Sequence, residues 1–387
     1  MEYIFWILLF IIIYSYLVYP IFLFICNIPK WIINKKQVNK DYEPLITMFV
    51  AAYNEQDFIK QKIENTLSLE YPKEKIQYIW VTDGSTDKTP DILKEYTDFV
   101  VLHSNERNGK TGAINRGMKY VKTPIVIFSD ANTILNKDAI LQLVSYFKNP
   151  KVGCVAGEKR ITPMNKDNAV NSGEGIYWLY ESFLKKNESM FNSVLGAVGE
   201  LFAIRADLFE PIEADTILDD FIISLRIAQK GYKIKYAPKA YASERASANI
   251  SEELKRKNRI AFGGFQSIAR LKPLLNPFKN PILSFQYISH KLLRWILVPL
   301  SMFLIFFVNI YLAFKQQWQG DWFYFMCIQL LFYFFVFLGY LFQSRKTKFK
   351  ILFVPYYVFI MNFSEVLGFF RYLKKQQSVN WEKAQRG

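Results

Sequence analysis

The chain has 387 residues, of which 51% are hydrophobic and 17% aromatic, and its formal net charge is +15 at pH 7. This composition excludes an intrinsically disordered chain, because such chains are poor in apolar and aromatic residues. With three widely separated cysteines and two histidines, the chain cannot form a disulfide framework, a thiolate zinc site or a multi-histidine metal centre. Any metal or hydrolytic chemistry must therefore depend on carboxylates.

An uncharged segment near the N-terminus predicts a retained membrane anchor. Residues 3–29 contain no charged side chain, and a helix needs about 20 apolar residues to cross a bilayer. The segment has no basic region ahead of it and no small-residue cleavage site, so a cleaved signal peptide is the weaker interpretation. We assign residues 1–29 to an N-terminal transmembrane anchor.

From about residue 44, apolar runs of strand length alternate with segments of helix length, which is typical of parallel βαβ units. The expected strands are 45–52, 76–82, 99–103, 124–129 and 152–156. The expected helices are 57–69, 89–96, 110–121, 137–147 and 221–230. Several strands are apolar on both faces, as a sheet covered by helices on both sides requires. The pattern predicts an α/β domain whose ligands bind beyond the carboxyl ends of the strands.

Polar side chains follow three of these strands, in the segments Asn54-Glu55, Asp83-Gly84-Ser85 and Asp130-Ala131-Asn132. Carboxylate and amide oxygens are ligands that Mg²⁺ or Mn²⁺ accepts together with substrate phosphates. Lys110, beside Gly109 at the start of an expected helix, adds a candidate diphosphate contact. Each segment alone is typical of an ordinary turn or helix cap, and only the combination favours a nucleotide site. The chain has neither a GxxxxGK[ST] nor a GxGxxG motif, which argues against a P-loop NTPase or a dinucleotide oxidoreductase.

Short motifs occur in order between about residues 50 and 265. They are Ala52-Tyr53-Asn54-Glu55, Asp83-Gly84-Ser85-Thr86-Asp87, Asn108-Gly109-Lys110 with Ala113-Ile114-Asn115, Asp130-Ala131-Asn132, Gly196-Ala197-Val198-Gly199, Leu218-Asp219-Asp220 and Arg256-Lys257-Asn258-Arg259-Ile260. Together they resemble the membrane-bound branch of glycosyltransferase family 2, which includes the synthases of cellulose, hyaluronan, chitin and poly-N-acetylglucosamine. The resemblance implies a GT-A domain over residues 44–265, with a mostly parallel sheet that binds a nucleotide sugar.

The resemblance also implies residue roles. Asp220 would be the general base that deprotonates the acceptor hydroxyl. On the donor side, the nucleotide sugar would be bound by Ala52, Tyr53, Glu55, Asp83, Lys110, Asn115, Asp130 and Arg259. Gly199, Glu200 and Asp219 would lie on the acceptor side. Asp130 and Asn132 would hold Mg²⁺ or Mn²⁺, which neutralises the diphosphate leaving group. Direct attack would invert the anomeric centre, so that an α-linked UDP-sugar gives a β-linkage.

Four positions, in three motifs, depart from the family pattern. Asn132 replaces the second carboxylate of the DxD motif, which lowers the negative charge offered to a metal. Asp219 is shorter than the glutamate that precedes the family's base. Arg256 and Ile260 stand where the family has the Gln and Trp of QxxRW, and the missing Trp argues against long-chain synthesis. Single transfer to a lipid-linked acceptor and processive polymerisation both stay open.

The C-terminal third returns to the membrane. Residues 266–291 predict interfacial helices in which aromatic and basic side chains alternate. Residues 292–344 predict a transmembrane hairpin, because 295–314 and 322–344 are uncharged and joined by a short linker. Residues 351–364 are too short for a clear span, so 351–387 predict an interfacial or re-entrant helix with a basic tail; a fourth span is the alternative.

Basic residues flank these spans on one side. They are Lys30, Lys35, Lys36 and Lys40 after the first span, Arg270, Lys272, Lys279, Lys291 and Arg294 before the second, and Arg345, Lys346, Lys348 and Lys350 after the third. The bias of Lys and Arg toward the cytoplasm places residues 30–294 in the cytoplasm, in a multi-pass protein of the cell (inner or plasma) membrane. Basic residues beside membrane spans indicate binding to anionic lipid headgroups and nucleotide phosphates, and they do not indicate binding to nucleic acid.

The expected partners are therefore a nucleotide-sugar donor, a polysaccharide or lipid-linked acceptor and membrane lipids, with a homo-oligomer or synthase subunits left open. A non-catalytic, nucleotide-binding or scaffolding subunit of a synthase complex is the alternative function. A transporter or channel is disfavoured, because the spans hold almost no ionisable side chains.

Overall fold

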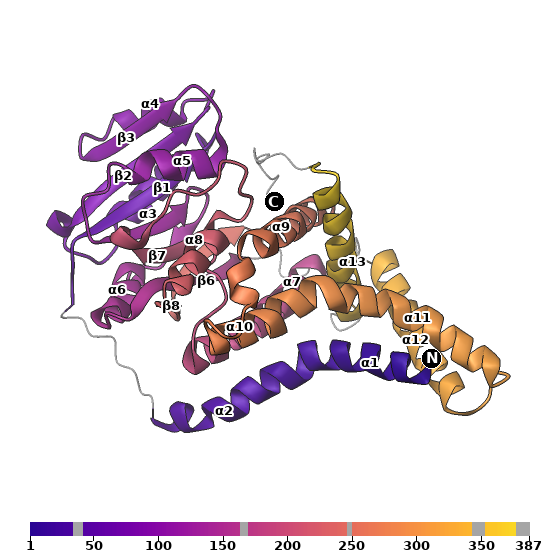
Figure 1. Cartoon of the computed structure of the whole chain (residues 1–387). Coiled ribbons are helices and arrows are strands. Elements are labelled where there is room, and N and C mark those ends of the chain that lie inside the picture. The colour runs from indigo at the N-terminus through magenta and orange to yellow at the C-terminus, as the bar shows by residue number, and fades with distance from the viewer. Residues whose placement is uncertain (34–41, 163–168, 246–249, 343–352, 377–387) are drawn as a thin grey trace.

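The computed structural model describes residues 1–33, 42–162, 169–245, 250–342 and 353–376. Figure 1 shows a sheet with helices on its faces at one end of the molecule and a group of long helices at the other. The basic residues predicted at 35, 36, 40 and 345–350, and the tail from 377, lie outside the described residues.

The sheet has eight strands in the order β3-β2-β1-β4-β7-β6-β8-β5. Their bounds are β1 (Ile46–Ala52), β2 (Ile76–Asp83), β3 (Phe99–Ser104), β4 (Ile125–Asp130), β5 (Ile134–Leu135), β6 (Val152–Thr162), β7 (Leu201–Arg205) and β8 (Lys233–Arg245). The first four strands pair in parallel, and β6 pairs in parallel with β8. β7 is antiparallel to both β4 and β6, and β5 is antiparallel to β8. The predicted mostly parallel α/β sheet is therefore present, with antiparallel pairings in its second half.

Alternate side chains of the central strands face two apolar layers. The helices on the sheet are α3 (Ile59–Leu67), α4 (Thr89–Lys94), α5 (Gly109–Met118), α6 (Ala139–Val144) and α8 (Asp219–Gln229). Met48 and Val50 pack with α3, α4 and α6, whereas Phe49 between them packs with α5 and α8. Because both layers are apolar, the strands are hydrophobic on both faces, which is the pattern that predicted them.

The first four strands lie within one residue of their predicted bounds, and the four helices between and after them lie within three residues. β6 is longer than predicted, because it runs on from residue 156 to Thr162. The sequence did not predict β5, β7, β8 or α7 (Ala169–Phe191). Two acidic side chains of α7, Glu181 and Glu188, are buried, with only 4% and 0% of their surface exposed, so α7 has no simple polar face.

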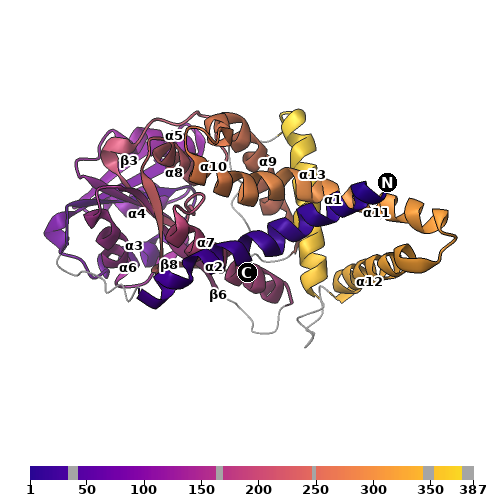
Figure 2. The same cartoon turned by 60° about the horizontal axis from the view of Figure 1, so that its bottom comes forward.

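Glu181 and Glu188 are buried because they bind helices from both ends of the chain. The Tyr19 hydroxyl donates to Glu188 Oε1 at 2.9 Å, and His290 Nδ1 lies 2.7 Å from the same oxygen. Arg294 Nη1 donates to Glu181 Oε1 at 2.7 Å. Figure 2 shows the N-terminal helix passing beside α7. These contacts connect the sheet domain to the long apolar helices.

Three helices are long and apolar enough to cross a membrane: Glu2–Ile32, Pro281–Lys315 and Gly320–Phe342. The first consists of α1 (Glu2–Ile13), the π-helical segment η1 (Tyr14–Val18) and α2 (Tyr19–Ile33). The second consists of α10 (Pro281–Tyr287), the π-helical segment η6 (Ile288–Leu297) and α11 (Val298–Lys315), and the third is α12 (Gly320–Phe342). Residues 281–291, which we predicted as part of a separate interfacial segment, are thus the first turns of the second apolar helix.

Two further helices pack against each other and against the apolar helices. α9 (Ile250–Arg270) lies against α13 (Phe353–Leu373), and the two backbones approach closely. A Cβ atom added at Gly368 would lie 2.4 Å from Ala261 Cβ. Within the described residues, α13 is not among the helices that are apolar enough to span a membrane. Its predicted position at the membrane surface stays a prediction.

Candidate functional site

The carboxyl ends of β1, β2 and β4 lie at one edge of the sheet. In the parallel pairing, Ala51 of β1 is level with Asp130 of β4, and Ala52 is level with Thr82 beside Asp83. Because parallel strands end on the same side, the polar residues that follow them are brought together. The start of α8 brings Asp219 and Asp220 to the same place, as the contacts of Lys110 show.

Lys110 lies at the centre of this group. Its Nζ donates to Asp130 Oδ1 at 2.7 Å and lies 3.6 Å from Asp219 Oδ2. A Cβ atom added at Gly199 would lie 3.1 Å from Lys110 Nζ and 3.6 Å from Asp220 Oδ2. Burial alone would lower the pKa of Lys110, but Asp130, Asp219 and Asp220 raise it overall. The ammonium group therefore stays charged. It lies where the segments of Lys110, Asp130, Gly199 and Asp219-Asp220 come together.

Asp220 has the electrostatic character of a base. It lies in the first turn of α8, where burial and the neighbouring Asp219 raise the pKa of its carboxyl to about 7, against the opposing effect of Lys110. A general base works best when its pKa lies near the working pH. The structure thus brings the predicted base close to Lys110 and Gly199.

Asp83 is almost fully buried, with 1% of its surface exposed. Its Oδ2 accepts a hydrogen bond from the Asn108 amide at 2.8 Å, and Arg116 Nη1 lies 3.5 Å from Oδ1. Burial raises the pKa of Asp83, while the Gly109 amide and Arg116 lower it. In the structure, Asp83 holds the loop that begins α5, and so positions Lys110.

The loop after β1 is tied to the loop after β2. Asn54 has a positive φ of 53°, and its Oδ1 accepts a hydrogen bond from the Thr86 amide at 2.8 Å. The Glu55 amide donates to Thr89 Oγ1 at 2.9 Å. The Arg107 guanidinium lies 3.8 Å from the centre of the Tyr53 ring. Tyr53 and Glu55 are half-buried at this edge of the sheet, where the sequence predicted a donor pocket.

Arg259 reaches the same carboxylates from α9. Burial lowers the pKa of its guanidinium, while Asp219, Asp130 and Asp220 raise it. Among the described residues, its buried Nε has no hydrogen-bond partner. A buried donor without a partner is uncommon in folded proteins, so this nitrogen is a candidate contact for a ligand.

Three predicted site residues have structural contacts instead. The side chain of Ala52 is 2% exposed and lies in the core. The Asn115 amide group binds the backbone of Ile212 in both directions, at 2.7 and 3.1 Å. The Glu200 carboxylate pairs with buried Lys159; burial alone would raise the pKa of Glu200, but Lys159 lowers it to about 2. Their predicted roles in ligand binding stay predictions.

The predicted metal ligands lie at the end of β4 and two residues beyond it. Asp130 is partly exposed and bound to Lys110, and Asn132 is half-exposed two residues later. Across the described ranges, no group of three or more His, Cys, Asp and Glu residues could hold a metal. One carboxylate and one amide oxygen nevertheless fit a hard cation that takes its other ligands from substrate phosphates and water.

The sequence did not indicate a role for Lys62, whose side chain binds the residues on both sides of the Asp130–Asn132 loop. Lys62 is fully buried, and its Nζ donates to Ser129 Oγ at 2.7 Å and to the Thr133 carbonyl at 2.8 Å. Burial lowers the pKa of Lys62 to about 7, against the effect of Asp130. The signal in the sequence was a lysine on the apolar face of a helix, next to Ile63. Its two partners flank the loop on either side, so we assign Lys62 a positioning role.

Replacing Lys62 should therefore disturb this loop. For Lys62→Met we expect a loss of about 10–100-fold in metal affinity or activity, the usual effect of removing a group that orients a metal ligand. The apparent Mn²⁺ activation constant and metal-free binding of UDP by calorimetry would both be measured. The matched control is Lys60→Met, because Lys60 is exposed on the same helix. Identical behaviour of the two variants would contradict the positioning role.

Comparisons with known proteins show which family the sheet domain resembles. Residues 47–212 match the sequence profile described as Glycosyl transferase family 2. The chain is 30% identical over 250 residues to a poly-beta-1,6-N-acetyl-D-glucosamine synthase of Staphylococcus aureus (strain MSSA476), a match that covers 62% of this chain and 60% of the relative. A synthase of the same name from Staphylococcus epidermidis is 29% identical over 233 residues, covering 58% of this chain and 56% of the relative. The match thus spans about 60% of the first relative's length.

Among solved structures, the mannosyltransferase PcManGT from Pyrobaculum calidifontis, in complex with GDP-Man and Mn²⁺, is similar to this chain with a TM-score of 0.71. The sequence identity is 21%, and the similarity covers 97% of this chain and 99% of that chain. At this identity the likeness establishes the fold, and it confirms the predicted GT-A architecture. The family profile, the similarity to the synthases and the shared fold agree, and we conclude that the chain contains a glycosyltransferase domain of the family 2 type, matched over residues 47–212.

Proposed function

We propose that the chain is a membrane-anchored, inverting glycosyltransferase that transfers a sugar from a UDP-linked donor to a growing polysaccharide or lipid-linked acceptor. The observation that carries this proposal is the close approach of Asp220 and Lys110 at Gly199, where the pKa of the Asp220 carboxyl is raised to about 7. A carboxylate of this basicity can accept the proton of an acceptor hydroxyl near neutral pH.

In the proposed reaction, Asp220 accepts the proton of the acceptor hydroxyl as its oxygen attacks the anomeric carbon. The bond between that carbon and the diphosphate oxygen breaks on the opposite face, so the new linkage is β when the donor is α. The electron pair of the broken bond leaves with the nucleoside diphosphate. A single base is sufficient, and the chemistry requires no covalent sugar–enzyme intermediate.

Cationic side chains would receive the leaving diphosphate. Lys110 has three protons, and its described carboxylate contacts at 2.7 and 3.6 Å use two of these directions. The buried Nε of Arg259 adds a second donor, and a guanidinium binds phosphate in a planar geometry. A divalent cation held by Asp130 and Asn132 would neutralise further charge on the diphosphate.

The relatives' names guide the choice of acceptor. Poly-beta-1,6-N-acetyl-D-glucosamine synthases match 62% of this chain, which supports a polysaccharide product, and N-acetylglucosamine is the first donor sugar to test. Ile260 in place of the family's Trp supports a short product or a single transfer. We place the sheet domain on the cytoplasmic side, where nucleotide sugars are available, because the basic residues flank the spans on that side.

The experiment uses the full chain in nanodiscs with Mn²⁺ or Mg²⁺ and measures release of nucleoside diphosphate from a panel of nucleotide sugars. UDP release from one donor, greater when a lipid extract or an oligosaccharide is added, would support the proposal and identify the acceptor class. Release of GDP alone would overturn the UDP assignment. Binding of UDP with no release from any donor would favour a non-catalytic subunit.

A further inference from the structure

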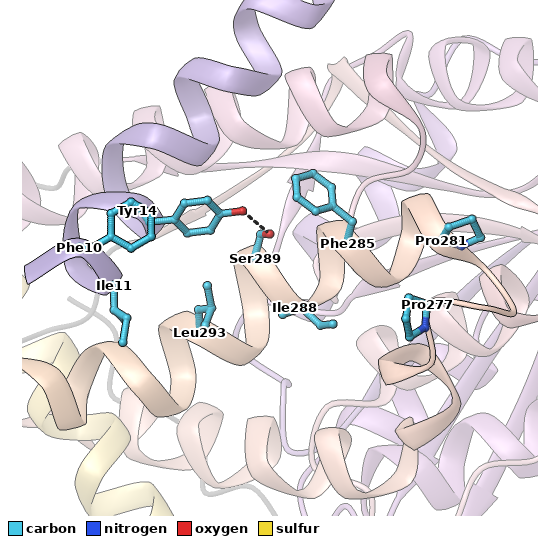
Figure 3. Close-up of a pocket in the computed structure, with 9 residues that line it drawn as sticks. All are labelled: Phe10, Ile11, Tyr14, Pro277, Pro281, Phe285, Ile288, Ser289 and Leu293. Carbon is cyan, nitrogen blue, oxygen red and sulfur yellow. Dashed lines mark hydrogen bonds between the residues drawn. The ribbon is translucent and has the colours of Figure 1, made fainter. Parts of the chain in front are cut away.

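A cavity of about 480 Å³ opens between the first and second apolar helices. Figure 3 shows the side chains that line it. From the first helix these are Phe10, Ile11 and Tyr14, and from the segment before and along the second helix they are Pro277, Pro281, Phe285, Ile288, Ser289 and Leu293. We call this cavity the interhelical groove. Its volume lies in the range of ligand-binding pockets, and its lining is almost entirely apolar.

Both walls of the interhelical groove depart from regular α-helix. Tyr14 begins the π-helical segment η1, and Ile288, Ser289 and Leu293 belong to η6. The two segments meet in a hydrogen bond of 2.8 Å between the Tyr14 hydroxyl and Ser289 Oγ (Figure 3). π-Helical turns are rare and occur frequently at functional sites. Irregular helix on both walls of one cavity, at Tyr14 and along η6, favours a functional site here.

The end of the groove at Pro277 and Pro281 is basic. Residues 254–320 contain ten Lys and Arg residues and no Asp or Glu. Two of these basic residues, Lys272 and Lys279, are exposed in the segment that leads into α10, and Phe278 beside Lys279 is 94% exposed. An exposed aromatic ring next to lysines is typical of a segment that lies at the membrane surface. This end of the groove therefore complements an anionic headgroup.

From these observations we propose that the interhelical groove binds an anionic phospholipid. One acyl chain lies between the two apolar helices, from Pro281 toward Phe10 and Leu293, and the headgroup meets Lys272 and Lys279. Both walls belong to helices that can cross a membrane, so the lipid can enter from the bilayer. Basic residues near a membrane surface attract anionic headgroups, which gives the groove its preference over neutral lipid.

The opposite side of the same helix contacts the catalytic helix. Leu283 and Tyr287 pack in the core cluster that contains Phe221 of α8. The Trp295 ring lies 5.4 Å from the Phe221 ring, and Phe221 follows Asp220 directly. A lipid in the groove thus supports the helix against which the base-bearing helix packs. The effect of the lipid on the helix that carries Asp220 rests on the proposed function, whereas lipid binding itself does not.

The test measures bound lipid on the purified full chain by native mass spectrometry, with palmitoyl-oleoyl phosphatidylglycerol and palmitoyl-oleoyl phosphatidylcholine as probes. We expect retained phosphatidylglycerol on the parent chain and at least tenfold less on Leu293→Trp, whose ring fills the groove. The matched control is Leu300→Trp, because Leu300 is 48% exposed on the same helix and does not line the groove. A second pair is Lys279→Gln against Lys315→Gln, where only the first should lose the preference for the anionic lipid.

Equal retention of phosphatidylglycerol by Leu293→Trp and Leu300→Trp, when both melt at the parent temperature, would overturn the proposal. Equal binding of the two probe lipids would also overturn it. Recovery of a lipid-linked saccharide from native membranes in place of phospholipid would assign the groove to the acceptor instead. Turnover is measured separately as UDP release in nanodiscs with and without phosphatidylglycerol. Lipid binding without turnover from any donor would leave the groove assigned and reject the proposed function.

Discussion

Asp220→Asn should reduce turnover by about 10²–10⁴-fold, the usual contribution of a general base, while binding of the donor nucleotide stays intact. The amide keeps the size and shape of the carboxylate but cannot accept a proton. UDP release and UDP affinity would be measured on the same preparation. The control is Asp207→Asn, which removes an exposed carboxylate outside the site. Turnover unaffected by Asp220→Asn would reject the assignment of the base.

The pH dependence of the parent chain tests the same assignment. Because burial and Asp219 raise the pKa of Asp220 to about 7, the carboxylate form needed for catalysis is lost below neutral pH. We expect kcat to rise between about pH 6 and 8 and then to level off. A profile that is flat from pH 5.5 to 9 would contradict a base with this pKa.

The raised pKa of Asp220 also determines how the stability of the folded chain changes with pH. Since the pKa of Asp220 is higher in the folded chain than in the unfolded chain, the stability it contributes is present at low pH and is lost as the pH rises through about 7. Because asparagine does not ionise, Asp220→Asn should not show this loss of stability with rising pH. The variant should therefore be at least as stable as the parent chain at pH 8, so unfolding would not explain its lost activity.

Lys110→Met should weaken donor binding and change the pH profile together. A hydrogen bond from an ammonium to a charged partner contributes roughly 1.5–3 kcal/mol, so we expect donor affinity to fall about 10- to 100-fold. Lys110 also lowers the pKa of Asp220, and its removal should move the rise in kcat to higher pH. Donor affinity would be measured by calorimetry with UDP, and kcat by UDP release across pH.

The control for Lys110→Met is Lys119→Met, because Lys119 is exposed at the end of the same helix. It should leave affinity and pH profile unchanged. If Lys110→Met lowers only the melting temperature, with both other measurements at parent values, Lys110 has a structural role and contacts no donor phosphate.

Much of the site could be predicted from the sequence, because the position of its residues depends on where the parallel strands end. β1, β2 and β4 are apolar on both faces, so the points at which polar residues begin mark the strand ends within about a residue. Asp83 and Asp130 follow from those points. The motif order added Lys110, Gly199, Asp219 and Asp220, which lie close together in the structure. Local pattern and strand geometry were sufficient for these residues.

Contacts between segments that are distant in the sequence could not be predicted from strand ends and motifs. Asn115 occurs within a recognisable motif, yet its amide group is used to hold Ile212. Glu200 follows Gly199 directly, yet its carboxylate is neutralised by Lys159, 41 residues away. Lys62 supports a loop 67 residues further along the chain. In each case the partner is chosen by packing between elements, and no spacing in the sequence encodes it.

The sequence by itself determined the α/β sheet, the three apolar helices and the residues that carry charge at the strand ends, because hydrophobic period and motif order are local properties. Only the tertiary structure decided that the second apolar helix begins at Pro281, that Glu181 and Glu188 of α7 are buried against both ends of the chain, and that Tyr14 of η1 meets Ser289 of η6 at one groove. These features depend on which helices meet, and a buried charge or an irregular turn is stable only when its partner is in place.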